Sequence, residues 1–185
     1  DKHQNKLNAK FVKEALKLLR PSIPVSVEIQ QIIAPACGKV LADATQIHQV
    51  IVNLCTNAWQ SMEETGGSLS IELRQVDIDV STEEQFPNLK KGPYARLSVF
   101  DSGPGIDEKV LDHIFEPFFT TKAVDKGTGL GLSVVHGIVC NHDGDVLVEN
   151  NKNGGTVFHV YLPIVSPLSE IAKVKPEPLP RGTEH

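Results

Sequence analysis

The chain has few of the features that mark secreted, membrane-spanning or nucleic-acid-wrapping proteins. Its three cysteines are odd in number and widely spaced, which gives no disulfide framework and favours a reducing compartment. No apolar run approaches the roughly 20 residues that span a bilayer, and no signal peptide is visible. The net charge of -5 argues against nucleic acid as a partner. We therefore expect a cytoplasmic domain that makes no membrane contact itself, which leaves a membrane-bound parent protein open.

The chain does contain a regular alternation of helical and strand patterns. Asp43 and Gln46 have the spacing of a capping box before one of the helices. A short helix is expected over 107–115 and a hairpin loop or insertion over 85–92. This order predicts an α/β (α+β) two-layer sandwich, with a mixed, mostly antiparallel sheet and helices packed on one face. The expected helices cover 8–20, 45–62 and 131–142, and the expected strands cover 25–29, 69–73, 95–99, 145–150 and 155–162.

The helix over 45–62 carries a stripe of amide side chains beside its apolar stripe. Gln49, Asn53, Asn57 and Gln60 follow one another at steps of 4, 4 and 3, so they share one face. Amides donate and accept hydrogen bonds without the desolvation cost of a charge, which suits the wall of a half-buried pocket. An asparagine oxygen is also a suitable ligand for Mg²⁺. The alternative is a solvated polar face that binds nothing.

A second candidate feature begins where a predicted strand ends in Asp101. Gly103 and Gly105 follow at once. A carboxylate at a strand end can accept a hydrogen bond from an exocyclic amine such as that of adenine, and glycines let a flat base approach the backbone. An ordinary Asx-turn after a strand is the alternative.

A third feature is the glycine-rich segment Gly127-Thr-Gly129-Leu-Gly131-Leu132, which runs into an apolar helix. Glycines expose the backbone N–H groups of a helix N-terminus, which form an anion site. The pattern is neither that of a dinucleotide-binding fold nor that of a P-loop. Upstream, Phe118 and Phe119 could anchor a mobile lid, and Lys122 could reach phosphates. The alternative is a loop packed by two phenylalanines beside an exposed lysine.

The order of these segments resembles that of the ATP-binding domains of histidine kinases. The resemblance covers about residues 43–162 and implies the GHKL fold, with ATP and Mg²⁺ as cofactors and the nucleotide held between helices and sheet. The matching segments are Asn53-Leu-Cys-Thr-Asn57-Ala58 (N box), Asp101-Ser-Gly-Pro-Gly105 (G1 box), Phe115-Glu-Pro-Phe-Phe119 (F box), Gly127-Thr-Gly-Leu-Gly131 (G2 box) and Gly154-Gly-Thr156.

The resemblance implies a role for each matching residue. Asn57 would coordinate Mg²⁺, and Asn53 would line the phosphate pocket. Asp101 would bind the adenine amine, often with a bridging water, while Gly103 and Gly105 would shape the base pocket.

The resemblance also implies an ATP lid with its hinge from Thr120 to Gly131. Thr156 would lie near the adenine end. The complete set of expected ATP-binding residues comprises Asn53, Asn57, Gln60, Asp101, Gly103, Gly105, Ile106, Phe119, Thr120, Thr121, Lys122, Gly127, Thr128, Gly129, Leu130, Gly131, Leu132 and Thr156.

Position 53 bears on the reaction. GHKL members that hydrolyse ATP, such as DNA gyrases, mismatch-repair proteins and heat-shock chaperones, carry a glutamate four residues before the metal-binding asparagine. Asn53 stands there in this chain and cannot act as a general base. The resemblance therefore implies a protein histidine kinase that transfers the γ-phosphate of ATP to a histidine on a separate domain. The alternatives are a non-catalytic nucleotide-sensing module and a GHKL ATPase. Gln60 departs from the family pattern, which often has Lys or Arg there.

The phosphoacceptor itself is not expected in these residues. Among the seven histidines, only His142 is followed by an acidic residue, and it lies at a helix end after the G2 box. We therefore expect no catalytic residue within this fragment. The spacing of His136, Cys140 and His142 is also compatible with part of a zinc site, but no fourth ligand is apparent, and helix-surface histidines are commoner.

The chain is expected to be a piece of a longer protein. Residues 1–10 are assigned to a linker from an upstream dimerisation and phosphoacceptor domain, 11–165 to the ATP-binding catalytic domain, and 166–185 to a Pro-rich linker. Residues 179–184 resemble the segment that leads into a receiver domain in hybrid kinases, with a disordered tail or a purification tag as alternatives. The expected partners are the upstream domain and a response-regulator receiver domain, and the fragment itself is expected to be a monomer.

Overall fold

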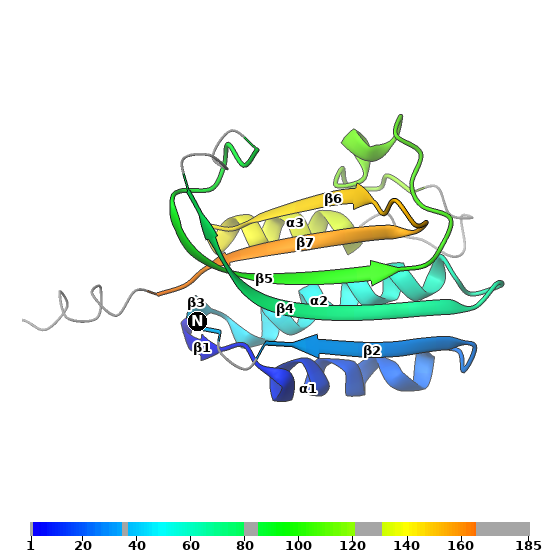
Figure 1. Ribbon diagram of the computed structural model, residues 1–185, viewed down its shortest axis with the longest axis horizontal. Coiled ribbons are helices and arrows are strands. Elements are labelled where there is room, and N and C mark those ends of the chain that lie inside the picture. The colour runs from blue at the N-terminus through cyan, green and yellow to red at the C-terminus, as the bar shows by residue number, and fades with distance from the viewer. Residues whose placement is uncertain (1, 35–36, 80–84, 121–130, 166–185) are drawn as a thin grey trace, which may run out of the picture.

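The computed structural model describes residues 2–34, 37–79, 85–120 and 131–165. Its centre is a five-stranded sheet with the strand order β2-β4-β5-β7-β6 (Figure 1). Only β2 and β4 pair in parallel, and the other neighbours are antiparallel, which confirms the predicted mixed, mostly antiparallel sheet. The strands are β2 (Val27–Ile33), β4 (Gly67–Ile78), β5 (Gly92–Asp101), β6 (Asp145–Asn150) and β7 (Thr156–Pro163).

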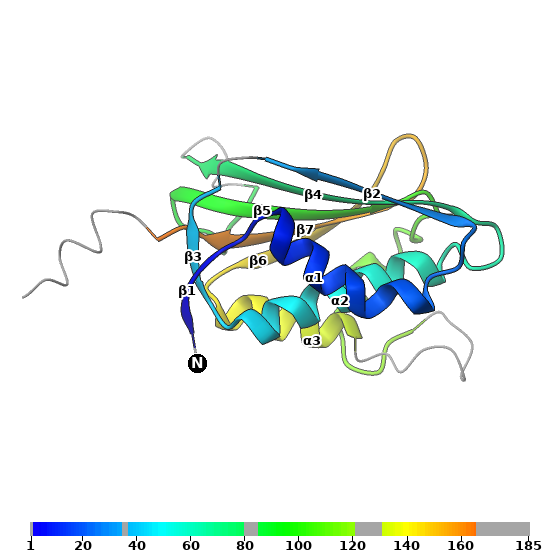
Figure 2. The same ribbon diagram turned by 90° about the horizontal axis from the view of Figure 1, so that it is seen from below.

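Three helices cover one face of this sheet. They are α1 (Ala9–Leu19), α2 (Ala44–Gln60) and α3 (Gly131–Asn141). Figure 2 shows all three on the same side of the strands, with α2 between α1 and α3. The predicted two-layer sandwich is therefore confirmed. No helix in the described part of the chain is both long and apolar enough to cross a membrane.

Helix α2 starts where the capping pattern predicted. The Asp43 carboxylate accepts hydrogen bonds from the backbone N–H groups of Thr45 at 3.0 Å and Gln46 at 3.2 Å, which satisfies two of the donors that a helix start leaves open. The backbone N–H of Asp43 donates to Nε2 of His142, just after α3. The same residue therefore begins α2 and links it to the end of α3.

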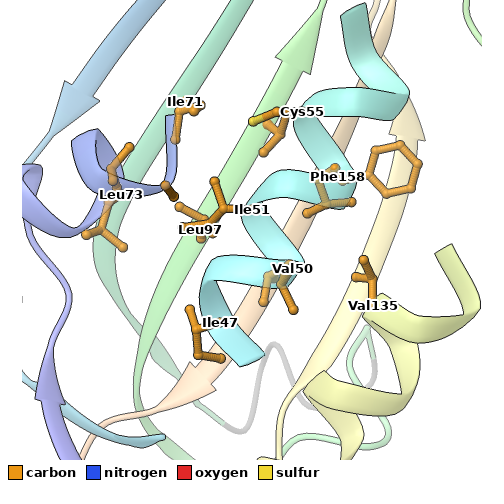
Figure 3. Packing of buried hydrophobic residues seen from close by; sticks show 14 of the residues in the cluster. Ile47, Val50, Ile51, Cys55, Ile71, Leu73, Leu97, Val135 and Phe158 are labelled. Atoms are coloured by element: carbon orange, nitrogen blue, oxygen red, sulfur yellow. The ribbon is translucent and has the colours of Figure 1, made fainter. Parts of the chain in front are cut away.

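The apolar stripe of α2 forms the middle of the hydrophobic core. Ile47, Val50, Ile51 and Cys55 are each at most 1% exposed. Figure 3 shows these side chains over the strands, with Ile51 beside Leu97 and Val50 on the side of α2 that faces Val135 of α3. They meet a layer of strand and α3 residues, namely Ile71, Leu73, Leu97, Val135 and Phe158. Burial of this stripe fixes the rotation of α2 about its axis.

The other face of the sheet carries a smaller apolar cluster at one end. Ile78, Tyr94 and Tyr161 project from three strands, and Leu89 covers them from the connection between β4 and β5. Residues 85–91 lie between these strands, as the predicted loop over 85–92 requires. The loop thus shields apolar strand surface that the helices leave open.

Two strands of the structure are not predicted by the sequence patterns. β1 (His3–Lys6) and β3 (Lys39–Ala42) form an antiparallel pair outside the main sheet. Leu7 follows β1 and is 3% exposed, in the main core. Residues 3–7, assigned from sequence to a linker, therefore contact the domain, while an upstream domain stays a prediction.

Two expected elements differ from the structure. The strand predicted over 25–29 begins at Val27, and Val25 lies in the preceding turn with a fully exposed side chain. The helix predicted over 107–115 is reduced to turns and a short 3₁₀ helix, Leu111–His113. Ile114 is the one buried residue among 107–115, so few apolar contacts support a longer helix there.

Replacing a core isoleucine of α2 should destabilise the domain far more than replacing an exposed one. Ile51 is 1% exposed, whereas Ile32 on the edge strand β2 is 49% exposed. Ile51→Ala should lower the free energy of unfolding by about 2–5 kcal/mol, and Ile32→Ala by less than about 1 kcal/mol. Urea denaturation of both variants measures the difference, and equal losses would contradict the assignment of α2 to the core.

Candidate nucleotide-binding site

The candidate residues gather at one end of the molecule. The carboxyl ends of β5, β6 and α2 all lie there, at the right of Figure 1. β5 ends in Asp101, β6 ends in Asn150, and α2 ends in Gln60. Segments that are far apart in sequence are therefore brought together by the register of the sheet and the direction of α2.

Asn53 links α2 to the start of α3. Its side-chain Nδ2 donates to the backbone carbonyl of Gly131 at 3.3 Å. Gly131 is the first residue of α3 and the last glycine of the predicted phosphate-binding segment. The amide stripe of α2 thus faces the helix N-terminus at which an anion would be expected.

Asn57 and Gln60 continue the same stripe toward the end of α2, and both are half-buried. Ser61 caps the helix, because its backbone N–H donates to the carbonyls of Asn57 and Trp59. Asn57 lies one turn beyond Asn53 on the same face. The amide oxygen of Asn57 is a ligand type that fits Mg²⁺, which prefers oxygen donors and retains part of its water.

Asp101 is buried at the end of β5. Its side chain accepts a hydrogen bond from the backbone N–H of Gly103 at 2.9 Å, and it is only 6% exposed. Burial raises the pKa of this carboxyl, and backbone hydrogen bonds from Gly103 and Thr156 partly oppose the rise. A buried acceptor with a raised pKa is a candidate for recognition of a hydrogen-bond donor on a ligand.

The glycine turn after Asp101 lies against the end of α2. A Cβ atom on Gly103 would stand 2.7 Å from Oγ of Ser61 and 3.0 Å from the Asp101 carboxylate. A side chain at position 103 would therefore force the Ser61 hydroxyl to move away. The turn connects the Asp101 carboxylate to the helix that carries Asn57.

Two residues that the sequence patterns did not identify hold this turn in place. Ser102 pairs with Ser68 at the start of β4: its backbone N–H donates to the Ser68 carbonyl at 3.1 Å, and its Oγ accepts from the Ser68 N–H at 2.9 Å. Asn150 binds both backbone groups of Ile106. The only signal for Asn150 in the sequence was its place at a predicted strand end, before a turn.

The phenylalanines of the F box divide between core and surface. Phe115 packs edge-on against Phe158 of β7, with ring centroids 6.3 Å apart, and Phe119 packs partly against the core. Phe118 is 75% exposed and has a positive φ of 65°. Of the predicted pair, only Phe119 therefore anchors this segment.

The remaining predicted residues fall into two groups. Ile106 and Leu132 are half-buried and pack partly against the core, Thr156 is 4% exposed beside Asp101, and Thr120 lies at the surface. Outside the described residues lie Thr121, Lys122, Gly127, Thr128, Gly129 and Leu130.

His142 has a structural place in the fold. Its Nδ1 donates to the Ile138 carbonyl at 2.7 Å, and its Nε2 accepts the N–H of Asp43 at 3.1 Å. Both ring nitrogens are thus used, and the side chain is 3% exposed. Among the residues that the structure describes, no group of three His, Cys, Asp or Glu side chains is placed to hold a metal ion.

Comparison with known proteins agrees with this geometry. Residues 42–166 match the family described as histidine kinase-, DNA gyrase B- and HSP90-like ATPases. The chain is 42% identical over 124 residues to the sensor kinase CckA of Brucella abortus, which covers 67% of this chain and 13% of that protein. It is 39% identical over 126 residues to the sensor histidine kinase ZraS of Escherichia coli, which covers 68% of this chain and 23% of that protein. The chain thus spans less than a quarter of these curated relatives.

A solved domain gives the fuller match. The catalytic domain of histidine kinase ThkA is 32% identical, with a TM-score of 0.66 over 87% of this chain and 95% of that one. ThkA in complex with the response regulator protein TrrA is 29% identical, with a TM-score of 0.65 over 89% of this chain and 42% of that one. The chain therefore belongs to the histidine kinase-, DNA gyrase B- and HSP90-like ATPase family, as an ATP-binding domain of the histidine kinase type.

Proposed function

We propose that this domain binds Mg-ATP and transfers the γ-phosphate to a histidine on a separate domain of a two-component sensor histidine kinase. The observation that carries the proposal is the side chain at position 53. Asn53 stands where ATP-hydrolysing relatives have a glutamate, and its Nδ2 donates to the Gly131 carbonyl at 3.3 Å.

The amide side chain at position 53 favours phosphoryl transfer over hydrolysis of ATP. A general base for water needs a carboxylate or another group that accepts a proton at neutral pH. An amide cannot do this. A carboxylate at position 53 would also turn an acceptor toward the Gly131 carbonyl, and the link to α3 would be lost. Position 53 therefore supplies no general base for water, and we assign the nucleophile to another domain.

The adenine end is assigned to Asp101 and the turn after it. The carboxylate is buried, so a hydrogen bond from the adenine amine is little weakened by competing water. Gly103 leaves open the volume that a Cβ would fill beside Ser61 and Asp101. Thr156 lies next to Asp101 in the sheet register and is assigned to the same end.

The metal end is assigned to Asn57. Its amide side chain lies half-buried on α2, one turn from Asn53, which itself contacts the start of α3. Mg²⁺ would neutralise negative charge on the phosphates during transfer. Asn53 and the N-terminus of α3 are assigned to the phosphates. The lid from Thr120 to Gly131, with Lys122, is predicted to close over the same phosphates. Gln60, which stands where the family often has Lys or Arg, is assigned to the same pocket wall.

The partners proposed for the parent protein follow from this reaction. A histidine on an upstream dimerisation domain receives the phosphate, and a response-regulator receiver domain takes it on. The solved complex of ThkA with the response regulator protein TrrA supports the second partner. The cytoplasm, where Mg-ATP is abundant, is the proposed location. A Pro-rich linker over 166–185 that leads to a receiver domain remains a proposal.

Removal of the metal ligand should abolish the contribution of Mg²⁺ to ATP binding. Mg²⁺ should strengthen ATP binding by the wild-type domain. In Asn57→Ala the increase in ATP affinity that Mg²⁺ causes should be at least about tenfold smaller, since even substitutions of residues outside the ligand shell cost this much at metal sites. Asn153→Ala, at an exposed position in the β6–β7 turn, is the matched control. Calorimetric titration with ATP, with and without MgCl₂, measures both. An unchanged Mg²⁺ effect in Asn57→Ala would remove this residue from the metal site.

The pH dependence of ATP binding should reflect the raised pKa of Asp101. Because burial raises this pKa, the free domain takes up a proton at a pH where an exposed aspartate stays ionised. Adenine needs the ionised acceptor, so binding releases that proton, and affinity falls as the pH drops through the raised pKa. As the pH is lowered from neutral through this raised pKa, affinity should fall more steeply for wild type than for Asp101→Asn, whose side chain does not titrate.

The comparison is made by titrating both proteins at a series of pH values. Protonation of ATP itself affects both equally and cancels in the ratio. Asp101→Asn should also bind about tenfold more weakly at neutral pH, because a hydrogen bond to a charged acceptor is replaced by a weaker one. Parallel pH profiles for the two proteins would show that Asp101 does not titrate in the binding reaction.

Phosphoryl transfer should require a second domain. We expect the chain alone to show no sustained release of ADP, and to label a separately produced, folded histidine phosphoacceptor domain of the parent when given γ-labelled ATP and Mg²⁺. Asn57→Ala should label it weakly or not at all. Sustained ATP turnover by the chain alone would favour a hydrolase. An unlabelled acceptor in the presence of bound ATP would favour a nucleotide-sensing module.

A further inference from the structure

The side chain of Asn150 forms two hydrogen bonds to one peptide segment far away in the sequence. Its Oδ1 accepts from the backbone N–H of Ile106 at 2.8 Å, and its Nδ2 donates to the Ile106 carbonyl at 2.6 Å. The amide thus pairs with Ile106 as a neighbouring strand would. Asn150 is the last residue of β6, which lies beside the segment that follows β5 (Figure 1).

This pairing fixes one end of the turn after Asp101, and the other end is fixed independently. At the first end, Ser102 exchanges two hydrogen bonds with Ser68 of β4. Between the two ends, Gly105 has a positive φ of 83°, a conformation that L side chains rarely adopt. Without Asn150, the remaining hydrogen bonds of this segment, those of Ser102 and that of Gly103 to the Asp101 carboxylate, would all lie before Gly105.

The space around Gly105 shows that the two residues are fitted to each other. A Cβ atom on Gly105 would stand 3.1 Å from Oδ1 of Asn150, which is closer than most side chains tolerate. The backbone of Gly105 is therefore seated against the Asn150 amide. The Gly105 carbonyl shares a planar peptide with the Ile106 N–H, so the hydrogen bond to Asn150 also holds that carbonyl.

We propose that Asn150 is a positioning residue for the base of the nucleotide: it holds Ile106, and through it Gly105, in the place that completes the base pocket beside Asp101. The inference rests on the proposed binding of ATP by this domain. Asn150 need not contact the nucleotide, because it acts through the backbone of residues 105 and 106.

The exposure of Asn150 distinguishes a positioning role from a role in the stability of the domain. Asn150 lies at the surface, so water can satisfy the Ile106 groups when the amide is removed, and the cost to folding is small. Water does not impose a position on the peptide. Loss of Asn150 should therefore affect ligand affinity more than thermal stability.

Substitution of Asn150 should weaken recognition of the base selectively. Asn150→Ala should bind ATP about tenfold more weakly than wild type, because ATP binding must then order a peptide that Asn150 no longer holds in place. It should bind inosine triphosphate, which has a carbonyl in place of the adenine amine, less than about threefold more weakly. The preference for ATP over inosine triphosphate should therefore be smaller in Asn150→Ala than in wild type. Asn151→Ala, in the adjoining turn, where the side chain accepts only from Asn153, should leave both affinities unchanged.

A second variant and a direct probe complete the experiment. Asn150→Asp keeps an acceptor for the Ile106 N–H but sets a carboxylate against the Ile106 carbonyl, so it should also weaken ATP binding. Hydrogen exchange at the Ile106 amide should be faster in Asn150→Ala than in wild type and should remain slow in Asn150→Asp. If the alanine variant does not fold, the aspartate variant, which has the same shape, decides.

The outcomes are distinct. Wild-type ATP affinity in either Asn150 variant overturns the inference while leaving the proposed function intact. Equal losses of ATP and inosine triphosphate affinity also overturn it, because they indicate general loosening of the domain. A wild-type domain that binds no ATP, or that does not discriminate ATP from inosine triphosphate, overturns the proposed recognition of the base by Asp101 and the inference with it.

Discussion

Burial of one side of α2 determines where the amide side chains on its neighbouring face point. Ile47, Ile51 and Cys55 are almost fully buried between the sheet and the other helices. Because a helix is rigid in rotation, fixing this stripe also fixes the amide stripe beside it. Asn53 and Asn57 are thus held in direction by packing several residues away, and no mobile segment has to place them.

Burial also sets the direction of the side chains on β5, where they alternate between the two faces of the sheet. Leu97 and Val99 point into the core, and Asp101 continues their alternation by two residues. The carboxylate is therefore carried into the interior by the register of the strand, and its raised pKa is a consequence of that burial. A polar group at this position has to find donors nearby, and the backbone of the glycine turn provides one within hydrogen-bonding distance.

The sequence predicted the parts of the fold and site that depend on local patterns. The cap of α2 at Asp43, its two stripes and the strand that ends in Asp101 each follow from spacing within about one element. The pairing of β1 with β3 could not be seen, since each strand has only four residues and the partner lies more than thirty residues away. The same holds for Asn150 and Ile106, which are 44 residues apart. Val25 was misplaced because an alternating pattern continues into the turn, where nothing covers it.

The hydrogen bond between His142 and Asp43 has a mechanical consequence. It ties the end of α3 to the beginning of α2, while Asn53 ties the beginning of α3 to the middle of α2. The first of these links is buried at the ring of His142, and the second lies at the surface, next to the site. A buried link is held more firmly than an exposed one. The end of α3 at His142 is thus tied to α2 more firmly than its beginning at Gly131, the end that faces the candidate site.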